Sequence, residues 1–141
     1  MADSTDFERL KYTWVQWHNS TGVFMKDYYK RYVEISNLAA RENGFNDYGE
    51  MWRFKYEDPN FIDNMKAIWR RVEPLYEQLH KYVRRELIKI YGDKMDPEDP
   101  LIPAHLLGNM WAQTWVDLYE RIKPFKDASD IDITNSLKVI K

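Results

Sequence analysis

The chain has 141 residues, and 44% of them are hydrophobic, which suits a single domain with a real core rather than a disordered segment. The formal net charge is −2 with both signs interspersed, so no basic stripe marks a nucleic-acid-binding surface, and no nucleic-acid partner is expected. Cysteine is absent, which excludes a disulfide framework and any metal site built on cysteine.

The N-terminal residues lack the basic and apolar regions of a signal peptide, and no run of about 18 apolar residues predicts a membrane span. From Asp6 onward the apolar spacing is helical almost throughout, which predicts an all-α fold without strands. A first helix is expected over residues 6–18, a break over 19–22 and a second helix over 23–41. Gly44 is placed to end the second helix in the left-handed conformation.

A short amphipathic stretch over residues 47–56 precedes the clearest helical pattern of the chain, which covers residues 61–90. Asp58 is expected to be the N-cap of this long helix, with Pro59 as its first-turn proline. Gly92 is expected to end it.

Aromatic rings widen the apolar face of the long helix beyond a single stripe, at Trp69, Tyr76 and Tyr82. Such a wide face favours packing on more than one neighbour, as in the interior of a larger helical domain. Pro74 lies in the middle of the pattern and predicts a kink, because proline removes one backbone donor.

The C-terminal third begins with a predicted loop over residues 93–103, which contains three prolines. A last strong helix is expected over residues 104–122, ended by Lys123 and Pro124. A weak turn of helix is expected near residues 132–137.

Three histidines are the candidates for metal chemistry: His18, His80 and His105. None stands four residues from another, the helical spacing on which zinc sites are commonly built. We therefore expect no metal site formed by this chain alone, and we expect His105 to pack or cap rather than to bind a metal.

Acidic side chains lie mostly beside Lys or Arg on helix faces, as Glu77 does with Lys81, which favours solvated ion pairs over acid–base catalysis. Arg84 and Arg85 could bind an anion, but a structural ion pair is favoured. No nucleophile signature is present. Gln113 stands between Trp111 and Trp115, and the residues alone leave two roles open for it: a structural polar residue or a donor to a carboxylate.

The most specific motif covers residues 102–115, which read IPAHLLGNMWAQTW, and shorter blocks are PLY at 74–76, LH at 79–80 and YVRR at 82–85. These blocks resemble the angiotensin-converting enzyme family of zinc peptidases, and the resemblance covers about residues 7–137. It implies an almost wholly helical domain with a central channel, of which residues 1–141 would be one partial, N-terminal segment without an internal boundary.

The resemblance also implies a function: family members release C-terminal dipeptides from oligopeptides. Zinc and a glutamate base, both held by an H-E-x-x-H motif, activate the attacking water. This motif is absent from the chain, which would end before it, so the chain alone is expected to be inactive and to bind no cofactor. The complete enzyme would bind zinc and chloride and would act on oligopeptides. It would work outside the cell, as a secreted or membrane-anchored protein. The remainder of the peptidase domain would be the packing partner of this chain.

Some family sites fall on this chain. Gln113 resembles the glutamine that binds the C-terminal carboxylate of the substrate, with Trp111 and Thr114 near the primed subsites. Tyr56 resembles the tyrosine of one chloride site, with Trp52 close by. A second chloride site of vertebrate enzymes uses an arginine where this chain has His18, and this departure argues against that site.

Two alternatives remain at this point. The chain could be a stand-alone helical binding or decoy module, or an unrelated helical bundle that binds another protein. A stand-alone module would need a polar surface where the rest of the domain once packed. The sequence shows no such replacement, because it keeps the large apolar rings of Trp14, Trp17, Trp69, Trp111 and Trp115.

Overall fold

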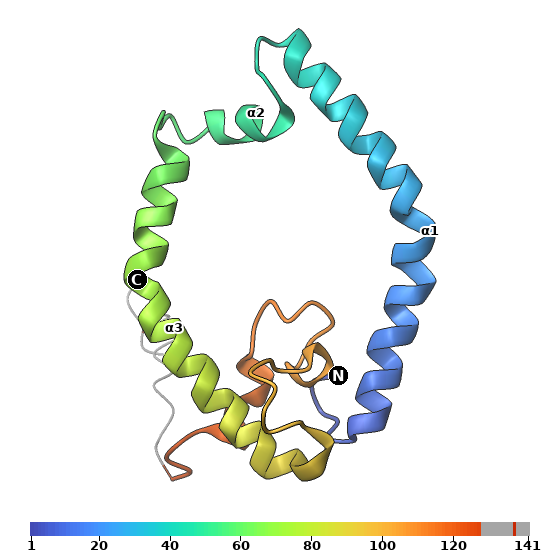
Figure 1. Cartoon of the computed structure of the whole chain (residues 1–141), viewed down its shortest axis with the longest axis vertical. Coiled ribbons are helices and arrows are strands. Elements are labelled where there is room, and N and C mark those ends of the chain that lie inside the picture. The colour runs from blue at the N-terminus through green and yellow to red at the C-terminus, as the bar shows by residue number, and fades with distance from the viewer. Residues whose placement is uncertain (128–136, 138–141) are drawn as a thin grey trace.

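The computed structural model of the protein describes residues 1–127 and residue 137, and it forms an open ring of helices (Figure 1). The helix α1 (Phe7–Glu42) forms one side, α2 (Tyr48–Phe54) crosses the top, and α3 (Phe61–Tyr91) forms the other side. Short turns follow: η1 (Gly92–Lys94), η2 (Ala104–Leu106), η3 (Val116–Leu118) and α4 (Tyr119–Ile122). No strand occurs in the described part of the chain, so the all-α prediction is confirmed there.

The predicted break over residues 19–22 is wrong, because α1 continues through it as one helix of 36 residues. The Asp6 side chain accepts a hydrogen bond from the Arg9 amide at 3.0 Å and caps the start. Inside the supposed break, the Thr21 hydroxyl donates to the Trp17 carbonyl at 2.8 Å. Starting a new helix costs more than carrying an existing one through a few weak residues, so cooperativity outweighs local propensity here.

The ends of the two long helices follow the predictions more closely. Gly44 has a φ of +85° directly after α1, and its amide donates to the Arg41 carbonyl at 3.0 Å, as expected for a left-handed glycine at a helix end. Gly92 has a φ of +58° and ends α3. The helix α3 runs through Pro74 without interruption and curves along its length (Figure 1).

The start of α3 lies later than predicted, because the N-cap position is Asn60 rather than Asp58, and Pro59 precedes the helix. Asp58 still serves this end: its carboxylate accepts from the Asn60 amide at 2.8 Å and from the Asn64 side chain at 2.9 Å. The Asp58 carboxylate therefore serves the start of α3 from a position two residues before the N-cap.

The predicted last helix over residues 104–122 is wrong. Only η2, η3 and the single turn of α4 are helical in this range, and a loop separates η2 from η3. Two residues of this loop have left-handed backbones that a continuous helix would not allow: Gly108 with a φ of +88° and Ala112 with a φ of +53°. Of the predicted turn near residues 132–137, all but Leu137 lies outside the described residues.

The core lies where the start of α1, the C-terminal half of α3 and the segment from Met95 to Ile122 meet, at the foot of the ring in Figure 1. Phe7 is central, with its ring edge-on to Tyr91 at 5.7 Å and to His105 at 4.7 Å between centroids. The remaining buried members are Leu10, Val83, Leu87, Met95, Leu106, Leu107, Leu118 and Ile122. We call this contact region the junction.

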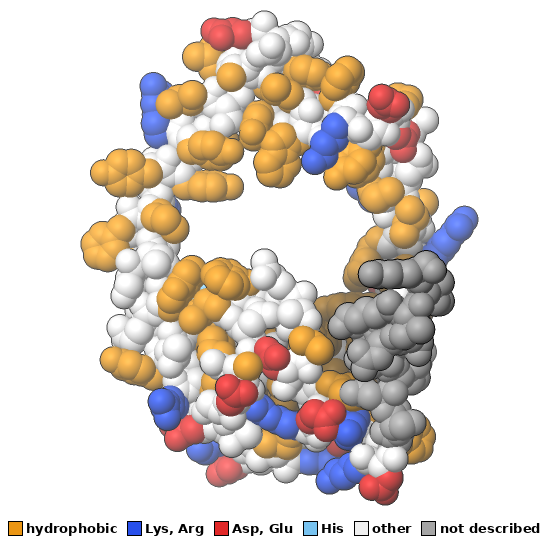
Figure 2. Space-filling view, turned by 180° about the vertical axis from the view of Figure 1, so that it is seen from behind, with side chains coloured by type: hydrophobic (Ala, Val, Ile, Leu, Met, Phe, Trp, Pro, Cys, Tyr) orange, Lys and Arg blue, Asp and Glu red, His pale blue; other side chains and the backbone are white. Residues whose placement is uncertain are grey.

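Beyond the junction, both sides of the ring carry large apolar side chains that face solvent. Tyr28 on α1 is 81% exposed and Leu75 on α3 is 70% exposed. Figure 2 shows a hole through the upper half of the molecule with apolar side chains around its rim. An exposed apolar surface of this extent is typical of a face that packs against another part of a protein or against a partner.

Candidate functional site

The segment over residues 107–116, here called the bridging loop, rises from the junction into the ring between α1 and α3 (Figure 1). On the α1 side, the Trp14 indole nitrogen donates to the Met110 carbonyl at 3.1 Å, and the Trp17 and Trp111 rings meet edge-on at 5.4 Å. On the α3 side, the Trp115 ring lies 6.1 Å from that of Tyr76. The loop is therefore held between two helices that are far from it in the sequence.

One side chain organises the interior of the bridging loop. The Asn109 Oδ1 accepts hydrogen bonds from the Trp111 amide at 2.9 Å and the Gln113 amide at 3.3 Å. Its Nδ2 donates to the Thr114 carbonyl at 3.1 Å. Sequence reasoning missed Asn109, although the Gly-Asn pair at 108–109 is a turn signal that could have flagged it.

The three predicted substrate-binding residues lie together on this loop, and all three are exposed. The Trp111 side chain is 60% exposed. The Thr114 hydroxyl accepts from the Val116 amide at 3.4 Å. Among the described residues none hydrogen-bonds the Gln113 side chain, so its amide can donate to a ligand. The expectation that Gln113 sits in a helical turn is wrong, because residues 109–115 are not helical.

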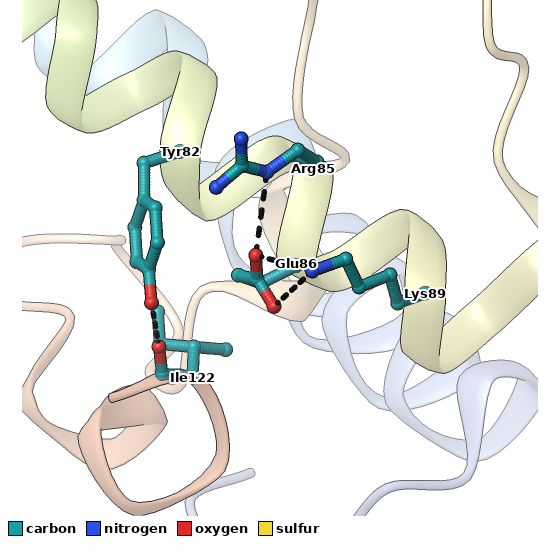
Figure 3. A network of polar contacts seen from close by, with 5 residues as sticks. All are labelled: Tyr82, Arg85, Glu86, Lys89 and Ile122. Carbon is teal, nitrogen blue, oxygen red and sulfur yellow. Dashed lines mark hydrogen bonds and ion pairs between the residues drawn. The ribbon is translucent and has the colours of Figure 1, made fainter. Parts of the chain in front are cut away.

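The segment after the loop is tied to α3 by the contacts drawn in Figure 3, where the Tyr82 hydroxyl donates to the Ile122 carbonyl. Nearby, Glu86 accepts from Lys89 at 2.8 Å and from Arg85 at 3.3 Å. These bonds, with that of Lys89 the stronger influence, hold the pKa of the Glu86 carboxyl below its ordinary value. Arg85 thus has the ion pair that was favoured for it.

The neighbouring Arg84 fixes the loop after α3. Its Nη2 donates to the carbonyls of Asp96 and Pro97 at 2.8 and 2.9 Å. Its partners are therefore carbonyl groups rather than a carboxylate. The helical pair of Glu77 and Lys81 is present as predicted, with 3.4 Å between its charged atoms, and it is exposed to solvent.

The three histidines lie in separate surroundings. His18 contacts the Trp14 carbonyl through Nδ1 at 2.8 Å, and His80 lies near the Trp115 ring at 6.3 Å. His105 is buried in the junction, so the expectation that it packs is confirmed. Burial lowers the pKa of His105, helped by nearby Lys11 and opposed by Glu8. Within the described residues no three histidine or acidic side chains gather as metal ligands would.

The two predicted chloride-binding residues lie at the top of the ring, and both are more than half exposed. The Tyr56 ring stacks on that of Phe61 at 4.6 Å, and the Lys55 ammonium lies 5.2 Å from its centre. The Trp52 ring lies instead beside that of Tyr48, at 5.5 Å. The structure brings a cation to Tyr56 and gives Trp52 a separate aromatic neighbour.

A cavity of about 810 Å³ lies between α2 and the start of α3, and neither Tyr56 nor Trp52 lines it. Most charged groups in its wall are acidic: Asp47, Glu50, Glu57, Asp58 and Asp63, with Arg53. Because these carboxylates would repel a halide, this cavity is not the place for chloride.

The amino-acid sequence of the chain is similar to that of one family of known proteins. The family described as angiotensin-converting enzyme matches residues 1–140. The chain is 42% identical to the angiotensin-converting enzymes of Oryctolagus cuniculus and Theromyzon tessulatum, over 97% of its own length in each case. It is 39% identical to that of Haematobia irritans exigua over the same share. It spans only 10% of the first of these relatives and 22% of the other two.

Proposed function

The chain belongs to the angiotensin-converting enzyme family, and we propose that it forms part of the substrate channel of a zinc peptidase that releases C-terminal dipeptides from oligopeptides. The proposal rests on the position of Gln113. Its side chain is exposed on the bridging loop, which lies between the two sides of the ring and is held by hydrogen bonds. A planar amide donor suits the carboxylate at the end of a peptide.

The role of Gln113 would be to place the substrate. A hydrogen bond to a charged partner is worth roughly 1.5–3 kcal/mol, enough to favour peptides with an unblocked C-terminus. Trp111 and Thr114 lie beside it and would line the same primed side of the channel. None of these groups can cleave a peptide bond, so they bind and orient the substrate only.

Zinc, when bound to the complete enzyme, would activate the water that attacks the peptide. The sequence holds no H-E-x-x-H, and the three histidines lie in separate surroundings, so the residues of this chain do not fit a zinc site. We therefore assign no metal-dependent step to them.

Chloride would be held in part by this chain. The Tyr56 hydroxyl and the Trp52 indole N–H are both donors that can face an anion, and the Lys55 ammonium adds positive potential beside Tyr56. Other residues of the complete enzyme would finish the site, because Tyr56 and Trp52 have separate ring neighbours here.

The rest of the domain would be the partner of the exposed apolar sides of the ring, and the complete enzyme would work outside the cell. In the described residues, no helix has the length and apolar character needed to cross a membrane. A stand-alone helical binding module is the second candidate, and the same exposed apolar sides support it. Zinc-dependent dipeptide release by a complete protein that contains this segment would exclude the second candidate.

The test is Gln113→Ala in the complete enzyme that contains this segment. We expect KM for a peptide with an unblocked C-terminus to rise about tenfold or more, with kcat changed little, because a bond to the substrate carboxylate is lost. A C-terminally amidated peptide should show no such rise. Gln16→Ala, at an exposed glutamine on α1, is the matched control. An unchanged KM for the unblocked peptide would remove Gln113 from the site.

A further inference from the structure

We propose that Asn109 is the positioning residue of the carboxylate-binding site, and that its side chain sets the place of Gln113 by fixing the backbone of the bridging loop. This inference rests on the proposed function of Gln113. It concerns a residue that touches no substrate and acts only through the loop.

The first argument is the number and direction of the contacts that Asn109 makes. One carboxamide binds three backbone groups, the amides of Trp111 and Gln113 through Oδ1 and the carbonyl of Thr114 through Nδ2. A carboxamide, which only Asn and Gln carry, has an acceptor oxygen and a donor nitrogen on the same carbon. Aspartate would keep the two bonds to amides and lose the bond to the carbonyl.

The second argument is what else holds Gln113. The contacts from α1 fix Met110 and Trp111, and those from α3 fix Trp115. Within the described residues, the hydrogen bond to Gln113 is the one from its backbone amide to Asn109. The helices therefore hold residues on either side of Gln113, while Asn109 holds Gln113 itself, the residue that would bind the substrate.

The third argument is that the loop does not take an ordinary conformation by itself. Ala112, which directly precedes Gln113, has a φ of +53° in the left-handed region that favours glycine. A strained residue persists only where its surroundings hold it, and such residues cluster at binding sites. The two bonds of Asn109 on either side of Ala112, to Trp111 and Gln113, supply that constraint.

Loss of this constraint should appear as weaker binding. A loop that samples several conformations must be ordered when the substrate arrives, which reduces affinity without changing the chemistry. Asn109→Ala should therefore raise KM for unblocked peptides by a factor similar to that of Gln113→Ala, with kcat nearly unchanged. The double variant should show little further rise, because both changes remove the same interaction.

The experiment compares KM and kcat for matched unblocked and amidated peptides in the complete enzyme, using Asn109→Ala, Asn109→Asp, Gln113→Ala and the double variant. Asn109→Asp keeps two of the three bonds, so its KM should lie closer to that of the native enzyme than to that of Asn109→Ala. Asn60→Ala is the matched control, since the Asn60 side chain makes no capping hydrogen bond at the start of α3.

The outcomes separate the inference from the proposed function. If Gln113→Ala raises KM and Asn109→Ala does not, the positioning role is wrong and the proposed function stands. If neither variant raises KM, the proposed function itself is wrong. If Asn109→Ala impairs unblocked and amidated peptides equally, or adds fully to Gln113→Ala, Asn109 is only structural. If Asn109→Ala does not fold, Asn109→Asp decides: a KM rise confined to unblocked peptides supports the inference, and an unchanged KM or an equal rise for unblocked and amidated peptides overturns it.

Discussion

At the scale of single residues, His105 differs from the other described members of the junction, because its side chain can take up a proton and become positively charged, whereas theirs are apolar or aromatic. Its Nε2 is buried, with no hydrogen-bond partner among the described residues. Its surroundings include Lys11 and Glu8 from α1, and Lys94, which lies 5.7 Å from the Phe7 ring. Burial favours the neutral imidazole, so protonation of His105 works against the packed junction.

The junction should therefore lose stability as the pH falls. In the folded chain the pKa of His105 is lowered below its ordinary value of 6.5, so the unfolded chain takes up its proton first. The contribution of His105 is complete above pH 6.5 and is lost as the pH falls from there through the folded pKa. The free energy of opening, measured by amide hydrogen exchange at Leu106 and Leu118, should decrease over that window.

His105→Phe removes the titrating group and should flatten the part of this pH dependence that lies just below pH 6.5. His80→Phe, at a partly exposed histidine on α3, controls for the replacement of a histidine as such. An equal decrease in the native chain and in His105→Phe would show that other groups carry the effect.

At the scale of elements, the two wrong helix predictions, the break over residues 19–22 and the helix over residues 104–122, have opposite causes. Residues 19–22 look like a break because Asn, Ser, Thr and Gly are weak helix formers, yet the helix already formed on both sides carries them. Residues 104–122 look helical because their apolar spacing fits a helix. There the contacts of Trp14 with Met110, 96 residues away, and of Asn109 within the loop override that spacing.

The same distinction decides how much of the candidate site could be predicted. The resemblance to the family placed Gln113, Thr114 and Trp111 in one segment, and the structure places them on one loop. The conformation of that loop could not be predicted, because it depends on indole contacts from a distant helix and on one left-handed alanine. Neither the indole contacts nor the left-handed alanine can be recognised from the spacing of apolar residues in the sequence.

The difference between the continuous helix α1 and the irregular bridging loop can be tested at two glycines. Gly22 lies inside α1, and an added Cβ would meet nothing within 4 Å, so Gly22→Ala should stabilise the helix by about 0.5–1 kcal/mol. Gly108 has a φ of +88°, and an added Cβ would lie 3.0 Å from the Asp117 Cβ, so Gly108→Ala should destabilise the bridging loop by about 1–3 kcal/mol.

Each variant serves as the control for the other, because both make the same chemical change. Thermal unfolding of the helical circular dichroism signal should shift upward for Gly22→Ala. Hydrogen exchange over residues 107–116 should accelerate for Gly108→Ala. A downward shift for Gly22→Ala would mean that residues 19–22 are not helical in solution.

At the scale of the whole molecule, most of the buried apolar residues that the structure describes lie in one region, and the long sides of the ring bury little. Among the residues that the structure describes, every buried apolar one except Ala40 lies in the junction, while α1 beyond Trp17 and most of α3 expose large apolar side chains. This distribution is in keeping with a chain that spans 10–22% of the length of its relatives.

The isolated chain should therefore be helical without unfolding as one unit. We expect the helical circular dichroism signal, which comes mostly from α1 and α3, to fall over a broad temperature range and before hydrogen-exchange protection in the junction is lost. The exposed apolar sides should also promote self-association or binding of a hydrophobic dye. A single sharp transition seen by both probes, with a monomeric mass, would contradict this expectation.

The junction also determines when the chain can form its core during synthesis. Phe7 and Leu10 leave the ribosome first, but Val83, the first of their core partners along the chain, follows Leu10 by 73 residues. At about 5–20 residues per second, α1 waits roughly 4–15 seconds for that partner and longer for the bridging loop. Until then, Phe7 and Leu10 have none of their described core partners from α3 or the bridging loop to pack against.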